Sequence, residues 1–103
     1  MKNLTQKDWY ENLNKLDDAV ILDVRTSYEF DDGKIPNALN IDVMNPHEFM
    51  TKVKELDKTL PYFVYCKAGV RSAQACELMQ QLGFDNTNNL VGGFSEWEGP
   101  TEN

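Results

Sequence analysis

The sequence predicts an α/β fold built on a mostly parallel sheet, in one domain that spans residues 1–103. Two apolar runs, at 19–24 and 62–65, have the continuous hydrophobicity of strands that are covered on both faces. Segments with helical spacing of apolar residues separate these runs, which is the order of elements typical of parallel sheets. A chain of 103 residues has room for one hydrophobic core of ordinary size.

The first half of the chain begins with a helix signal. Thr5 stands three residues before Asp8, which is the spacing of a capping box, and an apolar helix face follows at Trp9, Leu13 and Leu16. The elements expected next are the strand at 19–24, a short helix at 27–32 that ends at Gly33, and a half-exposed edge strand at 39–43.

The second half repeats this alternation. Asn45 is the expected N-cap of a helix with Pro46 in its first turn, and Phe49, Val53 and Leu56 form the buried face of that helix. The elements expected after it are the strand at 62–65, a loop at 66–71, a helix through Ala75, Leu78, Met79 and Leu82 that ends at Gly83, a short strand at 90–91, and a helical turn with Phe94 and Trp97. This last turn opens with Gly92 and Gly93, which are expected to allow close backbone packing.

The composition excludes several classes of function. Seventeen acidic and ten basic residues give a net charge of −7. This charge argues against a function in binding nucleic acids or anionic membranes, because a protein needs a basic face to bind either of them. No apolar segment is long enough to span a membrane, and none follows Met1 as a signal peptide would require. With two cysteines and one histidine, we expect no metal site, no other cofactor and no disulfide framework. We therefore expect a cytoplasmic protein with reduced thiols.

The candidate chemistry lies in the loop that follows the second apolar run. Cys66 stands at the carboxyl end of that predicted strand, where open α/β sheets bind their ligands, and just before a helix. Backbone N–H groups and the helix dipole favour the thiolate there, and the thiolate is the nucleophilic form of cysteine. Gly69 gives the loop access to unusual backbone angles, and Lys67 and Arg71 add positive charge. The only other arginine, Arg25, also follows a predicted strand, so both arginines are expected to bind an anion or to brace the loop that does.

Six short motifs occur in order along the chain. They are L-D-V-R at 22–25, E-F at 29–30, G-K-I-P-N-A at 33–38, N-I at 40–41, C-K-A-G-V-R at 66–71 followed by Ser72, and N-L-V-G-G at 89–93 followed by Trp97. Together they resemble the rhodanese family of sulfurtransferases over nearly the whole chain. The resemblance implies a three-layer α/β/α fold with a mostly parallel five-stranded sheet, and a loop that surrounds the sulfur of Cys66.

The resemblance also implies a mechanism of sulfur transfer. Cys66 would attack the outer sulfur of a small anionic donor such as thiosulfate, release sulfite and keep the sulfur as a persulfide. A thiol on a small molecule or a protein, or cyanide, would then accept that sulfur. The residues expected to bind the donor are Lys67, Ala68, Gly69, Val70, Arg71 and Ser72, through their N–H groups, together with Arg25. We expect the protein to act as a monomer.

Two other functions stay open. A sulfur-relay module, whose persulfide serves a partner protein, would need the same Cys66, and the sequence does not separate it from an enzyme that consumes thiosulfate. A phosphatase-like or arsenate-reducing enzyme is disfavoured, because relatives of those classes have five residues between the cysteine and the arginine, whereas this loop has four. The charges of Lys67 and Arg71 favour doubly negative thiosulfate over mercaptopyruvate. Two departures from the family pattern are Lys34 in place of histidine, which bears on donor preference, and Asn37 in place of glycine, which tolerates left-handed angles.

Simpler roles compete for several of these residues. Cys76 flanks an apolar helix face, so we expect it to pack in the core rather than to act as a resolving cysteine. His47 falls in the first turn of a helix and is expected to be solvated rather than to act as a base. Asp23 and Arg25 fit a structural ion pair at least as well as a role in the pocket. Lys67 fits a solvated lysine as well as a catalytic one.

Overall fold

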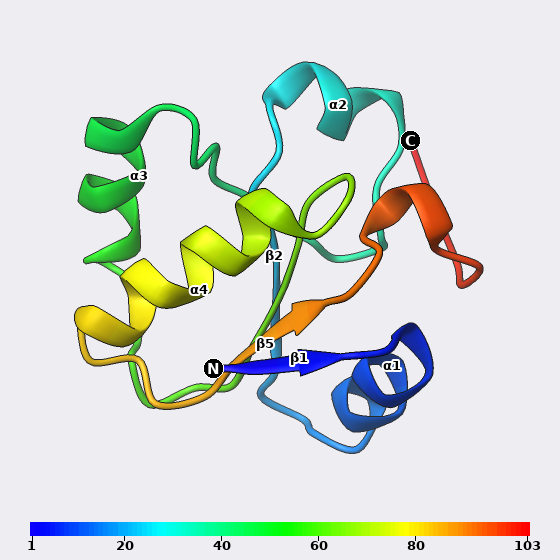
Figure 1. The fold of residues 1–103 in the computed structure, drawn as a ribbon, viewed down its shortest axis with the longest axis horizontal. Coiled ribbons are helices and arrows are strands. Elements are labelled where there is room, and N and C mark those ends of the chain that lie inside the picture. The colour runs from blue at the N-terminus through cyan, green and yellow to red at the C-terminus, as the bar shows by residue number, and fades with distance from the viewer.

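Five parallel strands form one sheet in the computed structural model, which describes all 103 residues (Figure 1). The strands are β1 (Lys2–Leu4), β2 (Val20–Asp23), β3 (Leu39–Asn40), β4 (Tyr62–Tyr65) and β5 (Thr87–Leu90). Their order across the sheet is β1-β5-β4-β2-β3, and every pair of neighbours runs parallel. The predicted α/β fold with a five-stranded parallel sheet is therefore confirmed.

Helices cover both faces of the sheet, as the three-layer prediction requires. They are α1 (Gln6–Asn14), α2 (Ser27–Asp32), α3 (Pro46–Val53) and α4 (Val70–Gln81), and a 3₁₀ turn (Phe94–Glu96) follows β5. On one face, α3 and α4 pack against Leu22 and Val64 in the larger buried cluster. On the other face, Trp9 of α1 packs against Phe63 and Tyr65. Side chains alternate between the two faces along β4, so both clusters meet at this strand.

None of the four helices has the length and continuous hydrophobicity that a membrane crossing needs. The helix α2 follows β2, and it therefore lies at the carboxyl-terminal edge of the sheet (Figure 1). The loop between β4 and α4 leaves the sheet at the same edge, so α2 and this loop are neighbours in space.

The last strand differs from its prediction. It covers Thr87–Leu90 rather than 90–91, and all four of its residues are buried although three are polar. Hydrogen bonds satisfy the polar side chains: Asn88 Nδ2 donates to the carbonyl of Tyr62 at 3.1 Å, and Asn89 Nδ2 donates to Asn3 Oδ1 at 3.0 Å. The strand β1, which hydrophobic spacing did not indicate, exists because its backbone pairs with β5. The apolar pattern therefore indicates only the end of β5, at Leu90, and nothing of β1.

The edge strand is also shorter than predicted. It comprises Leu39–Asn40 rather than 39–43, because the side chain of Asp42 accepts a hydrogen bond from the N–H of Met44 at 2.8 Å and turns the chain. The next helix begins as expected after Asn45, but the Asn45 side chain donates to Glu48 instead of accepting from the backbone. The turn at Asn37 has a φ of 69°, which confirms that asparagine adopts the left-handed conformation there.

The N-terminal caps of the first two helices differ in completeness. Thr5 accepts a hydrogen bond from the N–H of Asp8, as predicted, but the Asp8 side chain does not return one. A complete, reciprocal capping box stands instead at Thr26 and Glu29, at the start of α2. This second box fixes the position of Glu29, which the site uses.

Candidate active site

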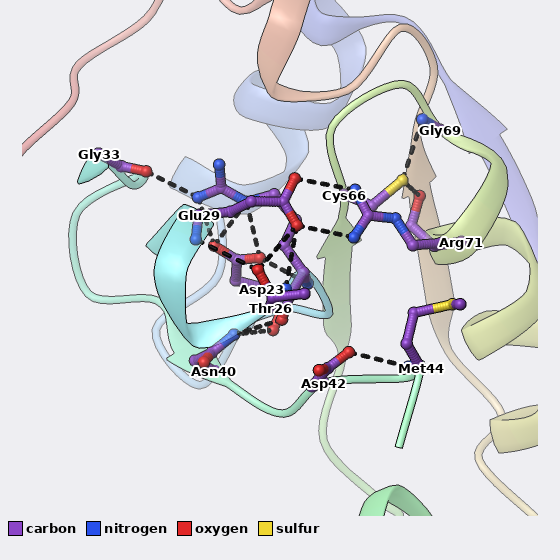
Figure 2. A network of polar contacts seen from close by, with 12 residues as sticks. Asp23, Thr26, Glu29, Gly33, Asn40, Asp42, Met44, Cys66, Gly69 and Arg71 are labelled. Atoms are coloured by element: carbon purple, nitrogen blue, oxygen red, sulfur yellow. Dashed lines mark hydrogen bonds and ion pairs between the residues drawn. The ribbon is translucent and has the colours of Figure 1, made fainter. Parts of the chain in front are cut away.

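The loop after β4 surrounds the sulfur of Cys66 (Figure 2). Cys66 is 1% exposed, and α4 begins at Val70, inside the segment predicted as loop. Gly69 has a φ of 103°, a left-handed angle that only glycine adopts without strain, and this turn directs its N–H back to the Cys66 Sγ at 3.0 Å. The loop therefore delivers backbone donors to one sulfur atom.

Ser72, in the first turn of α4, completes the surroundings of the sulfur. Its Oγ lies 3.3 Å from the Cys66 Sγ and also within hydrogen-bond distance of Asn89 Oδ1. A hydroxyl has one proton, so donation to Asn89 suits the thiol form of Cys66 and donation to Sγ suits the thiolate. Asn89 Nδ2 in turn donates to the carbonyl of Gly69 at 3.3 Å, which ties β5 to the loop.

The surroundings of Cys66 favour its ionised form. Burial opposes ionisation, but hydrogen bonds from the Ser72 hydroxyl and from the N–H groups of Ser72, Gly69 and Ala68 together outweigh burial and lower the pKa of the Cys66 thiol. The other thiol lacks these donors: Cys76, on α4, is fully buried in the larger apolar cluster, and burial raises its pKa to about 12. Its expected packing role is therefore confirmed.

Arg25 acts as a brace rather than as a free cation. Its guanidinium donates to both carboxylate oxygens of Asp23, at 2.7–3.1 Å, and to the carbonyl of Gly33 at 2.7 Å. It also lies over the rings of Phe94 and Tyr65, at 4.5 and 5.4 Å, and only 4% of the residue is exposed. Of the two roles left open for Arg25, the structure shows the ion pair with Asp23, and the charge expected for donor binding is neutralised inside the fold.

Arg71 is likewise paired. Its Nη1 and Nη2 donate to the two carboxylate oxygens of Glu29 at 2.8 and 3.0 Å, a bidentate pair that joins α4 to α2 (Figure 2). This pair lowers the pKa of Glu29 to about 2, because the Arg71 guanidinium stabilises the carboxylate, although partial burial opposes this. Of the two roles expected for Arg71, anion binding or bracing of the loop, this pair is of the bracing kind, and the Arg71 charge is balanced by Glu29.

Lys67 is the cation of this loop that has no side-chain partner. Its side chain is exposed and forms neither a hydrogen bond nor an ion pair, while its carbonyl accepts from the N–H of Ser95 at 2.9 Å. A cavity of about 200 Å³ lies beside the loop and is lined by Arg25, Glu29, Asp32, Gly33, Lys67, Phe94 and Ser95. A larger cavity, about 660 Å³, is lined by residues of α1, the start of β2 and the segment 35–37, and no cysteine lines it.

The remaining predicted residues are placed as follows. The N–H of Ala68 supports the Cys66 thiolate, whereas Val70 is 67% exposed at the start of α4. His47 is exposed, as expected. Lys34 lies 4.5 Å from the centre of the Phe30 ring, and its backbone pairs with Glu102. Glu29 and Asn89 were missed as site residues; the threonine three residues before Glu29 signals a capping box, but nothing in the sequence signals the role of Asn89.

Comparisons with known proteins agree with this geometry. The family model of the rhodanese-like domain matches residues 5–100. A thiosulfate sulfurtransferase of Coxiella burnetii is 34% identical over 97 residues, which cover 94% of this chain and 87% of the relative. A tRNA uridine(34) hydroxylase of Cytophaga hutchinsonii is 34% identical over 90 residues, but this chain spans only 29% of that longer protein. The crystal structure of a rhodanese-related protein from Thermoplasma volcanium superposes with a TM-score of 0.81 at 30% identity, covering 99% of this chain and 98% of the other.

Proposed function

Because the chain belongs to the rhodanese-like family, we propose that it transfers sulfane sulfur from thiosulfate to a thiol through a persulfide on Cys66. The observation that carries the proposal is the convergence of the Gly69 N–H and the Ser72 hydroxyl on one buried sulfur. These donors stabilise the thiolate before the reaction and the negative charge of the persulfide after it. A relative whose name gives thiosulfate as substrate supports the choice of donor.

The reaction consists of two exchanges at sulfur. The Cys66 thiolate attacks the outer sulfur of thiosulfate, the bond between the two thiosulfate sulfurs breaks, and sulfite leaves with the bonding electrons. The outer sulfur stays on Cys66 as a persulfide. An acceptor thiolate then attacks this sulfur, and Cys66 leaves as the thiolate, ready for the next donor.

The loop size argues against oxyanion chemistry. Only four residues separate Cys66 from Arg71, and the Arg71 guanidinium is occupied by Glu29. A phosphatase or arsenate reductase needs an arginine whose guanidinium N–H groups are free to bind the tetrahedral anion. In this protein, the hydrogen-bond donors around Cys66 instead converge on a single atom, the Cys66 Sγ.

The test is the intact mass of the protein after treatment with thiosulfate. The wild-type protein should gain one sulfur atom, which dithiothreitol removes, and Cys66→Ser should gain none while Cys76→Ser gains the same as wild type. No added sulfur on the wild-type protein, or equal loading of Cys66→Ser, would overturn the proposal.

A relay module that passes its persulfide to a partner protein is the second candidate. It is favoured by the pairing of Arg71 with Glu29, which leaves Lys67 as the one unpaired cation of the loop. A site with so little free positive charge attracts a dianion such as thiosulfate only weakly from dilute solution. Slow turnover with thiosulfate and small thiols, together with a long-lived persulfide, would support the relay.

A further inference from the structure

The most exposed large apolar side chains of this protein gather around the Cys66 loop. Tyr28 is 87% exposed, Val70 is 67% exposed and Met44 is 65% exposed, and no other large apolar side chain exceeds 50%. They come from three separate parts of the chain: α2, the start of α4, and the turn before α3. We call these three residues the apolar rim.

Contacts at the site place the three residues near one another. Tyr28 precedes Glu29 and Val70 precedes Arg71, and these two successors form the bidentate pair beside the sulfur. The N–H of Met44 donates to Asp42 at 2.8 Å, and the charge of Asp42 acts on Arg71. The apolar rim therefore lies around the pair of Glu29 and Arg71, next to the Cys66 loop.

The fold gains little from these side chains as they stand. An apolar side chain that stays in water contributes almost nothing to the hydrophobic stabilisation of the fold. Thiosulfate, a small dianion, gains nothing from them either. Exposed apolar groups that cluster beside a functional site are typical of a surface that contacts a macromolecule, where burying each of them stabilises the complex.

The charges beside the apolar rim indicate the kind of partner. Glu29 and Arg71 neutralise each other, which leaves the acidic Asp31, Asp32 and Asp42 against the basic Lys34 and Lys67, on a protein of net charge −7. A polyanion such as RNA would be repelled by this surface. A protein surface that carries lysine or arginine around an apolar centre complements it.

We propose that the physiological acceptor is a thiol of a partner protein, set in an apolar patch bordered by basic residues, which docks on Tyr28, Met44 and Val70. The inference rests on the proposed sulfur transfer and names its acceptor. In the transfer step, the partner thiolate attacks the outer sulfur of the Cys66 persulfide. A new bond forms between the partner sulfur and that outer sulfur, and the bond between the outer sulfur and the Cys66 Sγ breaks. The partner leaves as the persulfide, and Cys66 keeps the electron pair as a thiolate.

The test measures transfer from the loaded protein to blocked five-residue peptides with a central cysteine. One peptide carries two leucines and two lysines, the second replaces the leucines with serines, and the third replaces the lysines with glutamates; 2-mercaptoethanol is the small acceptor. Rates are normalised to the thiolate concentration of each acceptor. The basic apolar peptide should give the highest kcat/KM, by about tenfold over the other two peptides.

Variants separate docking from chemistry. Met44→Ser and Tyr28→Ser should each lower transfer to the basic apolar peptide about fivefold and leave transfer to 2-mercaptoethanol within twofold. Leu16→Ser is the matched control, because Leu16 is 41% exposed before β2, at the amino ends of the strands. Asp32→Asn should reduce the preference for lysine over glutamate, whereas Asp18→Asn, before β2, should not.

The outcomes are distinguishable from those of the proposed function. Loading of Cys66 is checked first by intact mass, with thiosulfate and separately with inorganic polysulfide. If thiosulfate fails and polysulfide loads, the proposed donor is wrong and the docking test proceeds with the polysulfide-loaded protein. Equal rates with all three peptides, or the same loss with 2-mercaptoethanol in Met44→Ser, would overturn the docking surface. A protein that holds no sulfur from either source would overturn both proposals.

Discussion

Cys66 and Cys76 are the same chemical group in two buried places, and the acidity of the two thiols is shifted in opposite directions. Both lose the solvent that would stabilise a thiolate. Cys66 regains that stabilisation from the loop N–H groups and the Ser72 hydroxyl, whereas Cys76 is surrounded by apolar side chains. At the scale of single residues, hydrogen-bond donors rather than exposure decide which cysteine has the more acidic thiol.

Alkylation measured against pH should separate the two thiols. We expect the rate for Cys66, measured in Cys76→Ser, to reach its plateau at a lower pH than that of a free thiol, whose pKa is about 8.5. The rate for Cys76, measured in Cys66→Ser, should still rise at the highest accessible pH, because its pKa is raised to about 12. Quantitative mass spectrometry of iodoacetamide adducts provides the rates. Coincident profiles near the free-thiol value would contradict the stabilised thiolate.

Lys67→Ala should raise the KM for thiosulfate about threefold to tenfold and change kcat less. Lys67 is the unpaired cation of the loop, so its removal weakens capture of the dianion more than the chemistry that follows. Added salt should raise the KM of the wild-type protein more than that of the variant, because screening acts on the charge that was removed. Lys58→Ala, in the turn before β4, is the control. A variant with wild-type KM and wild-type salt response would show that Lys67 is only solvated.

At the scale of elements, the bidentate pair between Arg71 and Glu29 joins two helices, α4 and α2. The capping box at Thr26 fixes Glu29 at the start of α2, and Arg71 occupies the first turn of α4, directly after the Cys66 loop. The pair therefore fixes the distance between α2 and the loop. We therefore expect Arg71 to contribute more to the shape of the Cys66 loop than to its free positive charge.

Glu29→Gln should make the free energy of unfolding less dependent on pH in the acid range. The pKa of Glu29 in the folded state, about 2, lies below its ordinary value of 4.5, so its contribution is fully present above about pH 4.5 and is lost as the pH falls towards 2. We expect the difference in free energy of unfolding between wild type and variant, about 1 kcal/mol at neutral pH for a partly exposed pair, to shrink across that window. Urea denaturation at several pH values measures it, with Glu48→Gln as the exposed control.

The same variant should also change capture of the donor. Removing the carboxylate releases the Arg71 charge beside the sulfur, so the KM for thiosulfate should fall although the protein is less stable. An unchanged or higher KM would indicate that Arg71 needs Glu29 to hold the loop in its active shape.

At the scale of the whole molecule, one buried cluster joins four distant segments. Arg25, after β2, connects the carboxylate of Asp23, the carbonyl of Gly33 after α2, and the rings of Tyr65 and Phe94. Next to it, Gly93 packs so closely on the loop that a Cβ there would lie 2.4 Å from the carbonyl oxygen of Lys67. The predicted close backbone packing is thus confirmed for Gly93, and the segment after β5 packs against the backbone of the Cys66 loop.

Arg25→Ala should destabilise the protein strongly, by about 3–5 kcal/mol. The variant would leave the Asp23 carboxylate buried without a counter-charge and the Gly33 carbonyl without a donor. Arg25→Lys should recover only part of the loss, because an ammonium cannot reproduce the guanidinium fork. Chemical denaturation gives the free energies, and Lys52→Ala, which removes an exposed ion pair, should cost less than about 1 kcal/mol. Wild-type stability in Arg25→Ala would refute the role of this cluster as a brace.

The sequence by itself determined the α/β class, the two central strands, the four helices and the place of Cys66 between a strand and a helix. These features follow from local patterns: the solid apolar strand at 62–65, the helical spacing around Trp9 and Ala75, and a cysteine between a strand and a helix. Each depends on residues that are close together in the chain, so the pattern can be detected without knowledge of the partner segments.

Only the tertiary structure decided which charges stay free and which polar residues are buried. The sequence shows Arg25 and Arg71 as two cations near the loop, but their partners Gly33 and Glu29 become neighbours only when α2 folds against α4. The polar strand β5 is buried because the side chains of Asn88 and Asn89 find hydrogen-bond partners far away in the chain. Pairing across long sequence separations depends on distance and direction in space, and composition and periodicity contain neither.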